Sequence, residues 1–135
     1  LFVREIAQMT RVTDLAADRR LLPEPLPPDW IALKINGPLF FAAADRVFGE
    51  IGTLCARRRG IVLYMDGVSI LDAGGVSALN RLIAQCRETG TRLAVTDLQF
   101  QPLKTLKRAG IEPIDGVLRF HPSLGDAIRD IQYDV

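Results

Sequence analysis

The sequence predicts an α/β fold, with a mostly parallel central sheet of about four to five strands and four or five helices packed against it. The first observation is an alternation along the chain, in which short apolar runs of strand length are followed by longer segments whose apolar residues recur at helical spacing. The second is the continuous apolar run Ile61–Met65, which lies between Gly60 and Asp66 and is typical of a strand buried on both faces. Strands that alternate with helices in this way become parallel neighbours joined by right-handed crossovers.

Length and charge are those of one ordinary domain. A chain of 135 residues suits a single hydrophobic core. Lys and Arg number 17 against 16 Asp and Glu, so the net charge of +1 indicates no strongly charged partner, and the few aromatic residues form no stacking stripe for nucleic acid. The longest apolar run, residues 39–44, is far shorter than the roughly 20 residues of a membrane helix.

The first 27 residues are expected to precede the compact domain. Leu1–Thr10 places apolar residues at helical spacing and predicts a short amphipathic helix. Asp18–Asp29 contains four of the eight prolines, which cannot continue a helix, and predicts a stiff extended linker. We therefore expect a helical and proline-rich linker over residues 1–27 and the compact domain over residues 28–135. Because the chain begins with Leu rather than Met, we expect it to be a fragment of a longer protein.

The first half of the domain contains a strand and a helix before the central strand. Trp30–Asn36 alternates inward and outward residues, as a strand with unequal faces does. Ala42–Arg58 has an apolar face at helical spacing and leads into the basic run Arg57–Arg59, followed by Gly60. Cations stabilise the last turn of a helix, which is one explanation of the arginines; a dedicated basic patch is the other.

The second half repeats the alternation. The predicted elements are a helix stopped by Gly90, a strand over Arg92–Leu98, a helix over Phe100–Ala109 and a short strand over Val117–Phe120. A last helix begins after Ser123, which forms a predicted capping box with Asp126.

The turn after the central strand is the candidate binding feature. Asp72 is placed to cap the following helix, and Gly74 and Gly75 allow a close approach of the backbone. The start of a helix carries unpaired N–H groups and the positive end of its dipole. An anion, a phosphate or the acidic group of a partner is expected to bind there.

The sequence contains no convincing catalytic or metal site. His121, the single histidine, has no predicted nucleophile or metal partner, and no pocket or nucleophile is predicted beside Asp66 and Asp72. Cys55 and Cys86 lack ligand spacing and are expected to be buried, reduced thiols. Neither a dinucleotide nor a triphosphate fingerprint follows any strand. We therefore expect no enzymatic activity, no metal and no cofactor.

Two segments resemble a known family. Residues 62–79, V-L-Y-M-D-G-V-S-I-L-D-A-G-G-V-S-A-L, resemble the signature of STAS domains, in which a strand ending in Asp leads to an Asp-Ser-x-Gly turn that opens a helix. Residues 37–47, G-P-L-F-F-A-A-A-D-R-V, resemble the STAS domains of sulfate-permease (SulP) anion transporters, and residues 1–10 resemble the segment after the last membrane helix in bacterial members. The positions expected to mark the family are Pro38, Phe40, Phe41 and Asp66.

The resemblance implies a STAS-type fold and a regulatory, protein-interaction role at the cytoplasmic face of the bacterial inner membrane. The chain would be the cytoplasmic domain of a SulP-type secondary anion transporter of the sulfate, bicarbonate or dicarboxylate class. A free-standing partner-switching protein of the anti-sigma-factor-antagonist kind is the alternative. In such relatives the serine of the turn is phosphorylated, whereas this chain has Ala73 at that position, which removes the hydroxyl.

The implied partners are the membrane domain of the same transporter and a cytosolic protein, and the implied docking surface surrounds the turn. Its expected residues are Asp72, Ala73, Gly74, Gly75, Ser77, Asn80 and Arg81. Weak nucleotide binding is expected at most, because a helix terminus offers an anion about 0.3–1 kcal/mol, or up to about 2 kcal/mol when partly buried. No binding of nucleic acid is expected.

Overall fold

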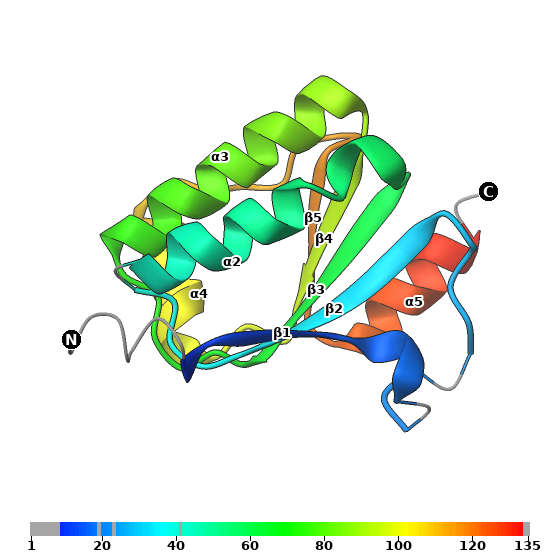
Figure 1. Ribbon diagram of the computed structural model, residues 1–135, viewed down its shortest axis with the longest axis horizontal. Coiled ribbons are helices and arrows are strands. Elements are labelled where there is room, and N and C mark those ends of the chain that lie inside the picture. Colours follow the sequence, from blue (N-terminus) through cyan, green and yellow to red (C-terminus); the bar gives the residue numbers. More distant parts are fainter. Residues whose placement is uncertain (1–8, 19, 23, 41, 134–135) are drawn as a thin grey trace.

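A five-stranded sheet forms the centre of the structure, a computed structural model that describes residues 9–18, 20–22, 24–40 and 42–133 (Figure 1). The strands are β1 (Arg11–Asp14), β2 (Trp30–Asn36), β3 (Gly60–Gly67), β4 (Arg92–Thr96) and β5 (Leu118–His121). They lie side by side in chain order, with β1 antiparallel to β2 and all other neighbours parallel. The predicted mostly parallel sheet is confirmed.

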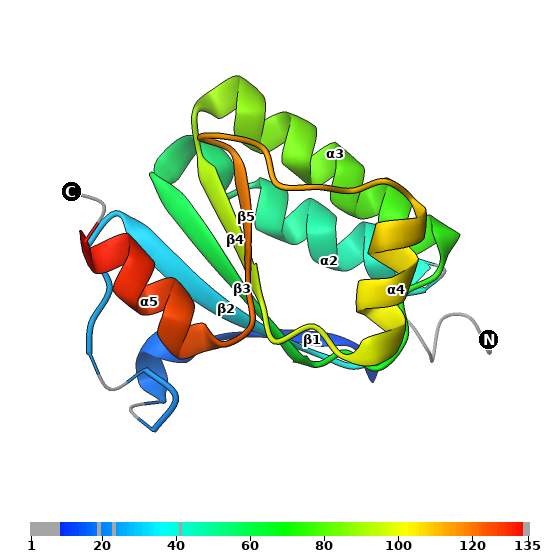
Figure 2. The same cartoon turned by 180° about the vertical axis from the view of Figure 1, so that it is seen from behind.

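Helices cover both faces of this sheet (Figures 1 and 2). The α-helices of the described chain are α2 (Ala42–Gly52), α3 (Ala73–Thr89), α4 (Phe100–Arg108) and α5 (Leu124–Tyr133). The first three lie on one side of the sheet and α5 lies on the other. Two short 3-10 turns, η1 (Leu15–Ala17) and η2 (Cys55–Arg57), precede β2 and β3. The number and order of helices agree with the predicted α/β fold.

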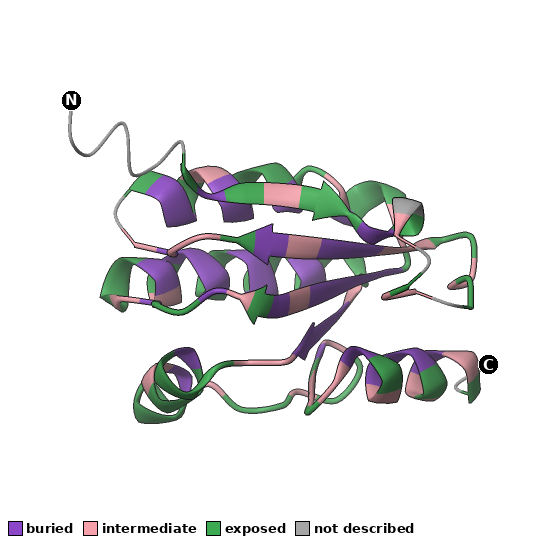
Figure 3. Cartoon of the chain, turned by 90° about the horizontal axis from the view of Figure 1, so that it is seen from below, coloured by how far each residue is buried: buried purple, intermediate pink, exposed green. Residues whose placement is uncertain are grey.

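The central strand β3 has a hydrophobic core on each side. Leu63 is fully buried in the larger core beneath α2, α3 and α4, while its neighbour Val62 is fully buried in the smaller core beneath α5. Ala32 and Ala94 flank Val62 on β2 and β4, and their small side chains allow α5 to approach the sheet. Figure 3 shows the buried residues along the strands and on the helix faces turned toward them. This double coverage explains the continuous apolar run in the sequence.

The structure corrects the predicted start of the compact domain. The edge strand β1 pairs with β2, and Leu15 directly after it is buried, so the domain extends N-terminally of Pro28. The proline-rich segment is not a free linker, because Leu22 and Leu26 pack against the smaller core. The sequence did not reveal β1 because only Val12 of its four residues packs against the larger core. The helix predicted over Leu1–Thr10 lies almost entirely outside the described residues.

Several predicted element boundaries also change. The helix predicted to continue to Arg58 ends at Gly52. Arg57 is the last residue of the separate turn η2, and Arg58 and Arg59 follow it, so these arginines do not cap α2. In α4, Leu106 is buried, whereas Leu103 is 37% exposed. The last strand, predicted over Val117–Phe120, is shifted by one residue, so that His121 ends β5.

The two cysteines are buried and reduced, as predicted. Cys55 of η2 and Cys86 of α3 are both free, and their Sγ atoms lie 3.5 Å apart. Burial, together with the neighbouring Cys55 thiol, raises the pKa of Cys86 far above its ordinary value. Both effects disfavour the thiolate, which is the reactive form.

We therefore expect Cys86 to be unreactive in the folded protein. An aromatic disulfide reagent added at pH 8 should label neither thiol of the native chain within minutes, and should label both after denaturation in guanidinium. The released chromophore measures the number of thiols that have reacted. Stoichiometric labelling of the native chain at a rate close to that of the denatured chain would contradict the buried pair.

Candidate functional site

Asp72 forms the N-terminal cap of α3. Its backbone is extended (φ −99°, ψ −175°), and its Oδ1 accepts a hydrogen bond of 2.8 Å from the backbone N of Gly75. This bond satisfies one of the N–H groups that have no partner within a helix. The predicted cap is confirmed, and it defines where the helix begins.

The two glycines after the cap differ in their surroundings. A Cβ atom on Gly75 would lie 2.5 Å from the carbonyl oxygen of Leu39 and would also meet the side chain of Leu71. Only glycine therefore lets α3 pack this closely against the loop after β2. A Cβ atom on Gly74 would have its nearest neighbour, Asp72 Oδ1, at 3.3 Å. The close approach predicted for both glycines holds for Gly75 and is wrong for Gly74.

The start of α3 presents a surface of small and polar groups, which we call the α3 face. Its exposed members are Ala73, Gly74, Ser77, Asn80 and Arg81, with Asp72 half-buried and Gly75 buried beneath them. Arg81 forms an ion pair with Asp45 of α2, with Nη2 and Oδ1 2.5 Å apart. The structure thus places all seven predicted residues within the first half of one helix and its cap.

The first turn of α4 holds the loop that leads into the α3 face. The side-chain amide of Gln101 makes two hydrogen bonds to the backbone of Leu71, at 2.8 and 3.0 Å, and Gln99 Nε2 donates to the carbonyl of Asp66 at 2.6 Å. Two large apolar side chains are exposed in this region, Ile70 at 46% and Phe100 at 77%. The sequence analysis did not identify them, although Phe100 stands between two glutamines and away from an apolar run.

The start of β1 lies at the same edge of the sheet as the α3 face (Figure 1). Thr10 Oγ1 donates a hydrogen bond of 2.6 Å to the carbonyl of Pro38, and the Arg46 side chain donates to the carbonyl of Thr10. Leu39, next to Pro38, accepts a 3.4 Å hydrogen bond from the backbone N of Asp72. A continuous set of contacts therefore joins the first described residues to the cap of α3.

Three of the four positions expected to mark the family, Pro38, Phe40 and Asp66, lie around this edge. The carbonyl of Pro38 holds Thr10, Phe40 is half-buried, and Asp66 is exposed near the end of β3. Phe41 lies outside the described residues. The carbonyl groups of Pro38 and Asp66 support the loops beside the α3 face, because they accept hydrogen bonds from Thr10 and Gln99.

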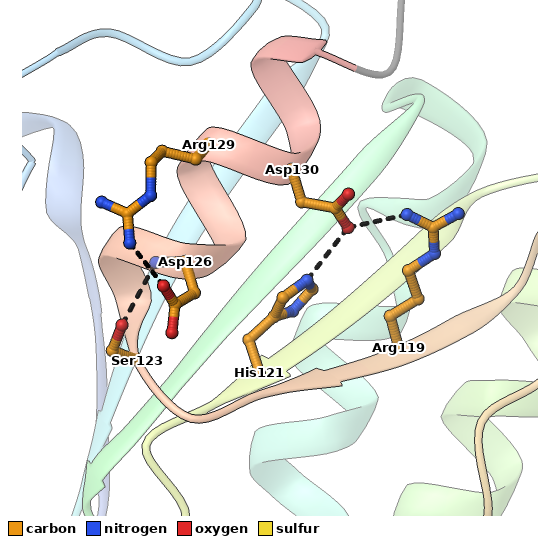
Figure 4. A network of polar contacts seen from close by, with 6 residues as sticks. All are labelled: Arg119, His121, Ser123, Asp126, Arg129 and Asp130. Carbon is orange, nitrogen blue, oxygen red and sulfur yellow. Dashed lines mark hydrogen bonds and ion pairs between the residues drawn. The ribbon is translucent and has the colours of Figure 1, made fainter.

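A polar network that the sequence analysis missed joins β5 to α5 (Figure 4). Asp130 Oδ2 accepts hydrogen bonds from His121 Nε2 at 3.0 Å and from Arg119 Nη1 at 2.7 Å. The bond from His121, followed by that from Arg119, lowers the pKa of Asp130. The sequence predicted no nucleophile or metal partner for His121. Its partner in the structure is a carboxylate, that of Asp130, which lies in another element. The network holds α5 against β5.

The start of α5 confirms half of the predicted capping box. The backbone N of Asp126 donates a hydrogen bond of 3.1 Å to Ser123 Oγ. The carboxylate of Asp126 contacts Arg129 (Figure 4), so this residue supports the first turn of the helix through an ion pair. Ser123 is accordingly a structural residue of the helix terminus.

The described part of the chain lacks two kinds of feature. It contains no group of three or more His, Cys, Asp and Glu side chains arranged to hold a metal ion. None of its helices combines the length and the hydrophobicity that crossing a bilayer requires.

Comparison with known proteins identifies related domains. The family model described as STAS domain matches residues 25–127. No curated protein sequence matches the chain. Among solved structures, a sulfate transporter family protein from Wolinella succinogenes is 25% identical, with a TM-score of 0.70 over 89% of this chain and 96% of its own.

Two other solved structures show the same fold at lower identity. Murine Slc26a9, an anion transporter in the inward-facing state, is 17% identical with a TM-score of 0.73, and the match covers 97% of this chain but 24% of the transporter. The anti-sigma factor antagonist SpoIIAA in its unphosphorylated form is 14% identical with a TM-score of 0.60, over 82% of this chain and 96% of its own.

The contrast between the two glycines leads to a stability prediction. Gly75→Ala should lower the free energy of unfolding by about 1–3 kcal/mol, because the methyl group overpacks a site closed by backbone. Gly74→Ala is the matched control and should change the free energy of unfolding by less than about 1 kcal/mol. Urea denaturation followed by circular dichroism measures both. Equal effects of the two substitutions would contradict the close approach at Gly75.

The Asp130 network leads to a prediction about pH. The pKa of Asp130 in the folded chain lies below its ordinary value of 3.8, so the network contributes stability above that value and loses it as the pH falls through the folded-state pKa. Asp130→Asn should therefore remove part of the loss in melting temperature between about pH 4 and pH 2. Asp115→Asn, at an exposed position outside the network, is the control. Parallel pH profiles for wild type and Asp130→Asn would exclude this contribution.

Proposed function

The chain belongs to the STAS domain family, and from this premise we propose that it is a regulatory protein-interaction domain of a SulP-type secondary anion transporter, with the α3 face as its docking surface. The observation that carries the proposal is the surface at the start of α3. Ala73 and Gly74 are exposed and have almost no side chain, so a partner can approach the helix terminus closely. The buried Gly75 and the Asp72 cap hold that terminus rigidly in place.

The transporter context is supported by two kinds of evidence. The 25% identity to a sulfate transporter family protein extends over most of both chains. The segment at Thr10 is joined through Pro38 and Leu39 to the cap of α3, so a membrane domain preceding this chain would lie beside the α3 face. The domain would then act at the cytoplasmic side of the bacterial inner membrane, in contact with its own membrane domain or with a cytosolic protein.

Ala73 determines how such a docking surface behaves. SpoIIAA has solved structures in both phosphorylated and unphosphorylated forms, and in the family pattern a serine stands where this chain has Ala73. Without a hydroxyl, this position cannot accept a phosphate. We infer that the α3 face stays in its unphosphorylated form and is not switched at this residue.

A second function is kept open by the other structural neighbours. Anti-sigma factor antagonists, among them SpoIIAA and a protein from Mycobacterium paratuberculosis with a TM-score of 0.63, share the fold over 82% and 90% of this chain. A free-standing partner-switching protein would use the same α3 face. Ala73 argues against this function, because the switch in the family pattern requires a serine at that position.

The proposed function involves no catalysis at the α3 face. It requires no catalytic residue and no cofactor, and the transported anion would bind in the membrane domain near the bilayer midplane. A nucleotide gains at most about 2 kcal/mol from the helix terminus, which is less than two factors of ten in affinity. We infer weak nucleotide binding at most in this place.

Ala73→Glu tests docking because it separates binding from folding. The helix dipole tolerates a negative charge at the start of α3, so the melting temperature should change little. A carboxylate desolvated against a partner is costly, so binding should weaken by tenfold or more. Ala56→Glu, at an exposed residue near the opposite edge of the sheet, is the matched control.

Transport by the full-length protein in cells and recovery of co-purified proteins are the readouts. Unchanged melting with impaired transport or a lost partner supports docking by the α3 face, and loss of an anti-sigma factor rather than of transport favours the second function. Wild-type transport and unchanged partners in Ala73→Glu would overturn the proposal.

A further inference from the structure

A small cavity lies at the edge of the sheet opposite the α3 face, between the starts of the parallel strands and α5. Its volume is about 100 Å³, and it is lined by Trp30, Arg59, Arg92, Arg119, His121 and Asp130 together with apolar groups. We propose that this cavity, which we call the arginine cavity, binds a small oxyanion of the sulfate or phosphate kind. The proposal is independent of the docking function, because it concerns other residues at the other end of β3.

Strand register brings the lining residues together from distant parts of the sequence. Arg59 directly precedes β3 and Arg92 opens β4, and the backbone N of Arg92 donates a 2.9 Å hydrogen bond to the carbonyl of Arg59. Trp30 opens β2 opposite Gly60, and its ring covers Gly60 so closely that a Cβ atom there would clash with it. Two arginines and a tryptophan therefore come together at one end of the sheet.

The charges around the cavity favour an anion. Among the residues that the structure describes, three arginines line it, Arg59, Arg92 and Arg119, together with the carboxylate of Asp130, which pairs with Arg119. Figure 4 shows that Asp130 turns toward Arg119 and His121, and Oδ2 accepts hydrogen bonds from both. Guanidinium groups match oxyanions in geometry and charge, and the apolar walls formed by groups such as Leu93 strengthen such bonds by excluding water.

The size of the cavity decides between a small ion and an organic ligand. At about 100 Å³ it is much larger than the roughly 10–15 Å³ that one water needs. It is smaller than a cavity of about 150 Å³ that holds benzene and well below the roughly 300 Å³ at which pockets for drug-sized ligands begin. A single tetrahedral oxyanion fits this range, whereas a whole nucleotide does not.

The sequence offered two explanations of the three consecutive arginines: residues of the last turn of a helix, or a dedicated basic patch. In the structure each of the three has different surroundings. Arg59 lines the arginine cavity, and Arg58 lines a neighbouring hollow beside Trp30. Arg57 ends η2 and lines neither of these two hollows. Arg57→Gln therefore removes the same charge as Arg59→Gln from a residue two positions away, without removing a lining group.

Trp30 provides a built-in probe because it is the single tryptophan of the chain and lines the cavity. We would titrate the chain with sodium sulfate, and separately with sodium phosphate, at an ionic strength held constant with sodium chloride, and record tryptophan fluorescence. The expected result is a saturable change for wild type. Arg59→Gln and Arg92→Gln should weaken binding by about tenfold or more, since each removes a charge-assisted hydrogen bond, while Arg57→Gln should bind as wild type does.

The same titrations define what would overturn the proposal. A signal that does not saturate, or one that Arg57→Gln weakens as much as Arg59→Gln, indicates general ionic effects instead of a site. Titration with adenosine monophosphate forms a further arm: Arg59-dependent binding tighter than that of phosphate would contradict a cavity limited to small ions. Thermal unfolding without added anion checks the fold of each variant. If Arg92→Gln does not fold, Arg59→Gln still tests the proposal, because Arg59 is an exposed residue that precedes the strand.

Discussion

The coverage of β3 on both faces is the constraint on which the rest of the structure depends. Leu63 belongs to the core under α2 and α3, and Val62 belongs to the core under α5, so the middle of the strand has no surface to offer a ligand. A ligand can therefore bind only near the two ends of the strand, where the neighbouring strands also end. The α3 face follows the carboxyl end of β3, and the arginine cavity surrounds its amino end.

The rigidity of the α3 face comes from buried atoms, and its accessibility comes from small side chains. Gly75 packs against the Leu39 carbonyl, and its backbone N–H donates a hydrogen bond to the Asp72 carboxylate. The helix terminus therefore cannot shift without breaking both the cap and the close contact. Above this support, Ala73 and Gly74 add almost no bulk. A partner can therefore approach the backbone directly. The family fold supplies the position of the terminus, and Ala73 has no hydroxyl group.

The opposite edge is organised by charge. Arg59 and Arg92 are brought together by the pairing of β3 with β4, and Asp130 of α5 is held by Arg119 and His121 of β5. Guanidinium groups that lie close together repel one another. An oxyanion bound between the apolar walls would offset that repulsion. The two edges thus differ in the groups that they present: nearly bare backbone at one and guanidinium groups at the other.

The sequence by itself determined the order of the elements from β2 onward and the cap of α3, because burial periodicity and capping are local patterns that survive in the linear chain. Ile61–Met65 and Asp72 are examples. Tertiary structure alone decided the rest. The edge strand β1 is specified by hydrogen bonds to β2 rather than by an apolar pattern. The close approach belongs to Gly75 and not to Gly74 because the Leu39 carbonyl lies above only one of them. The meeting of Arg59 with Arg92, and of His121 with Asp130, results from strand register and helix placement, which join residues that no local pattern connects.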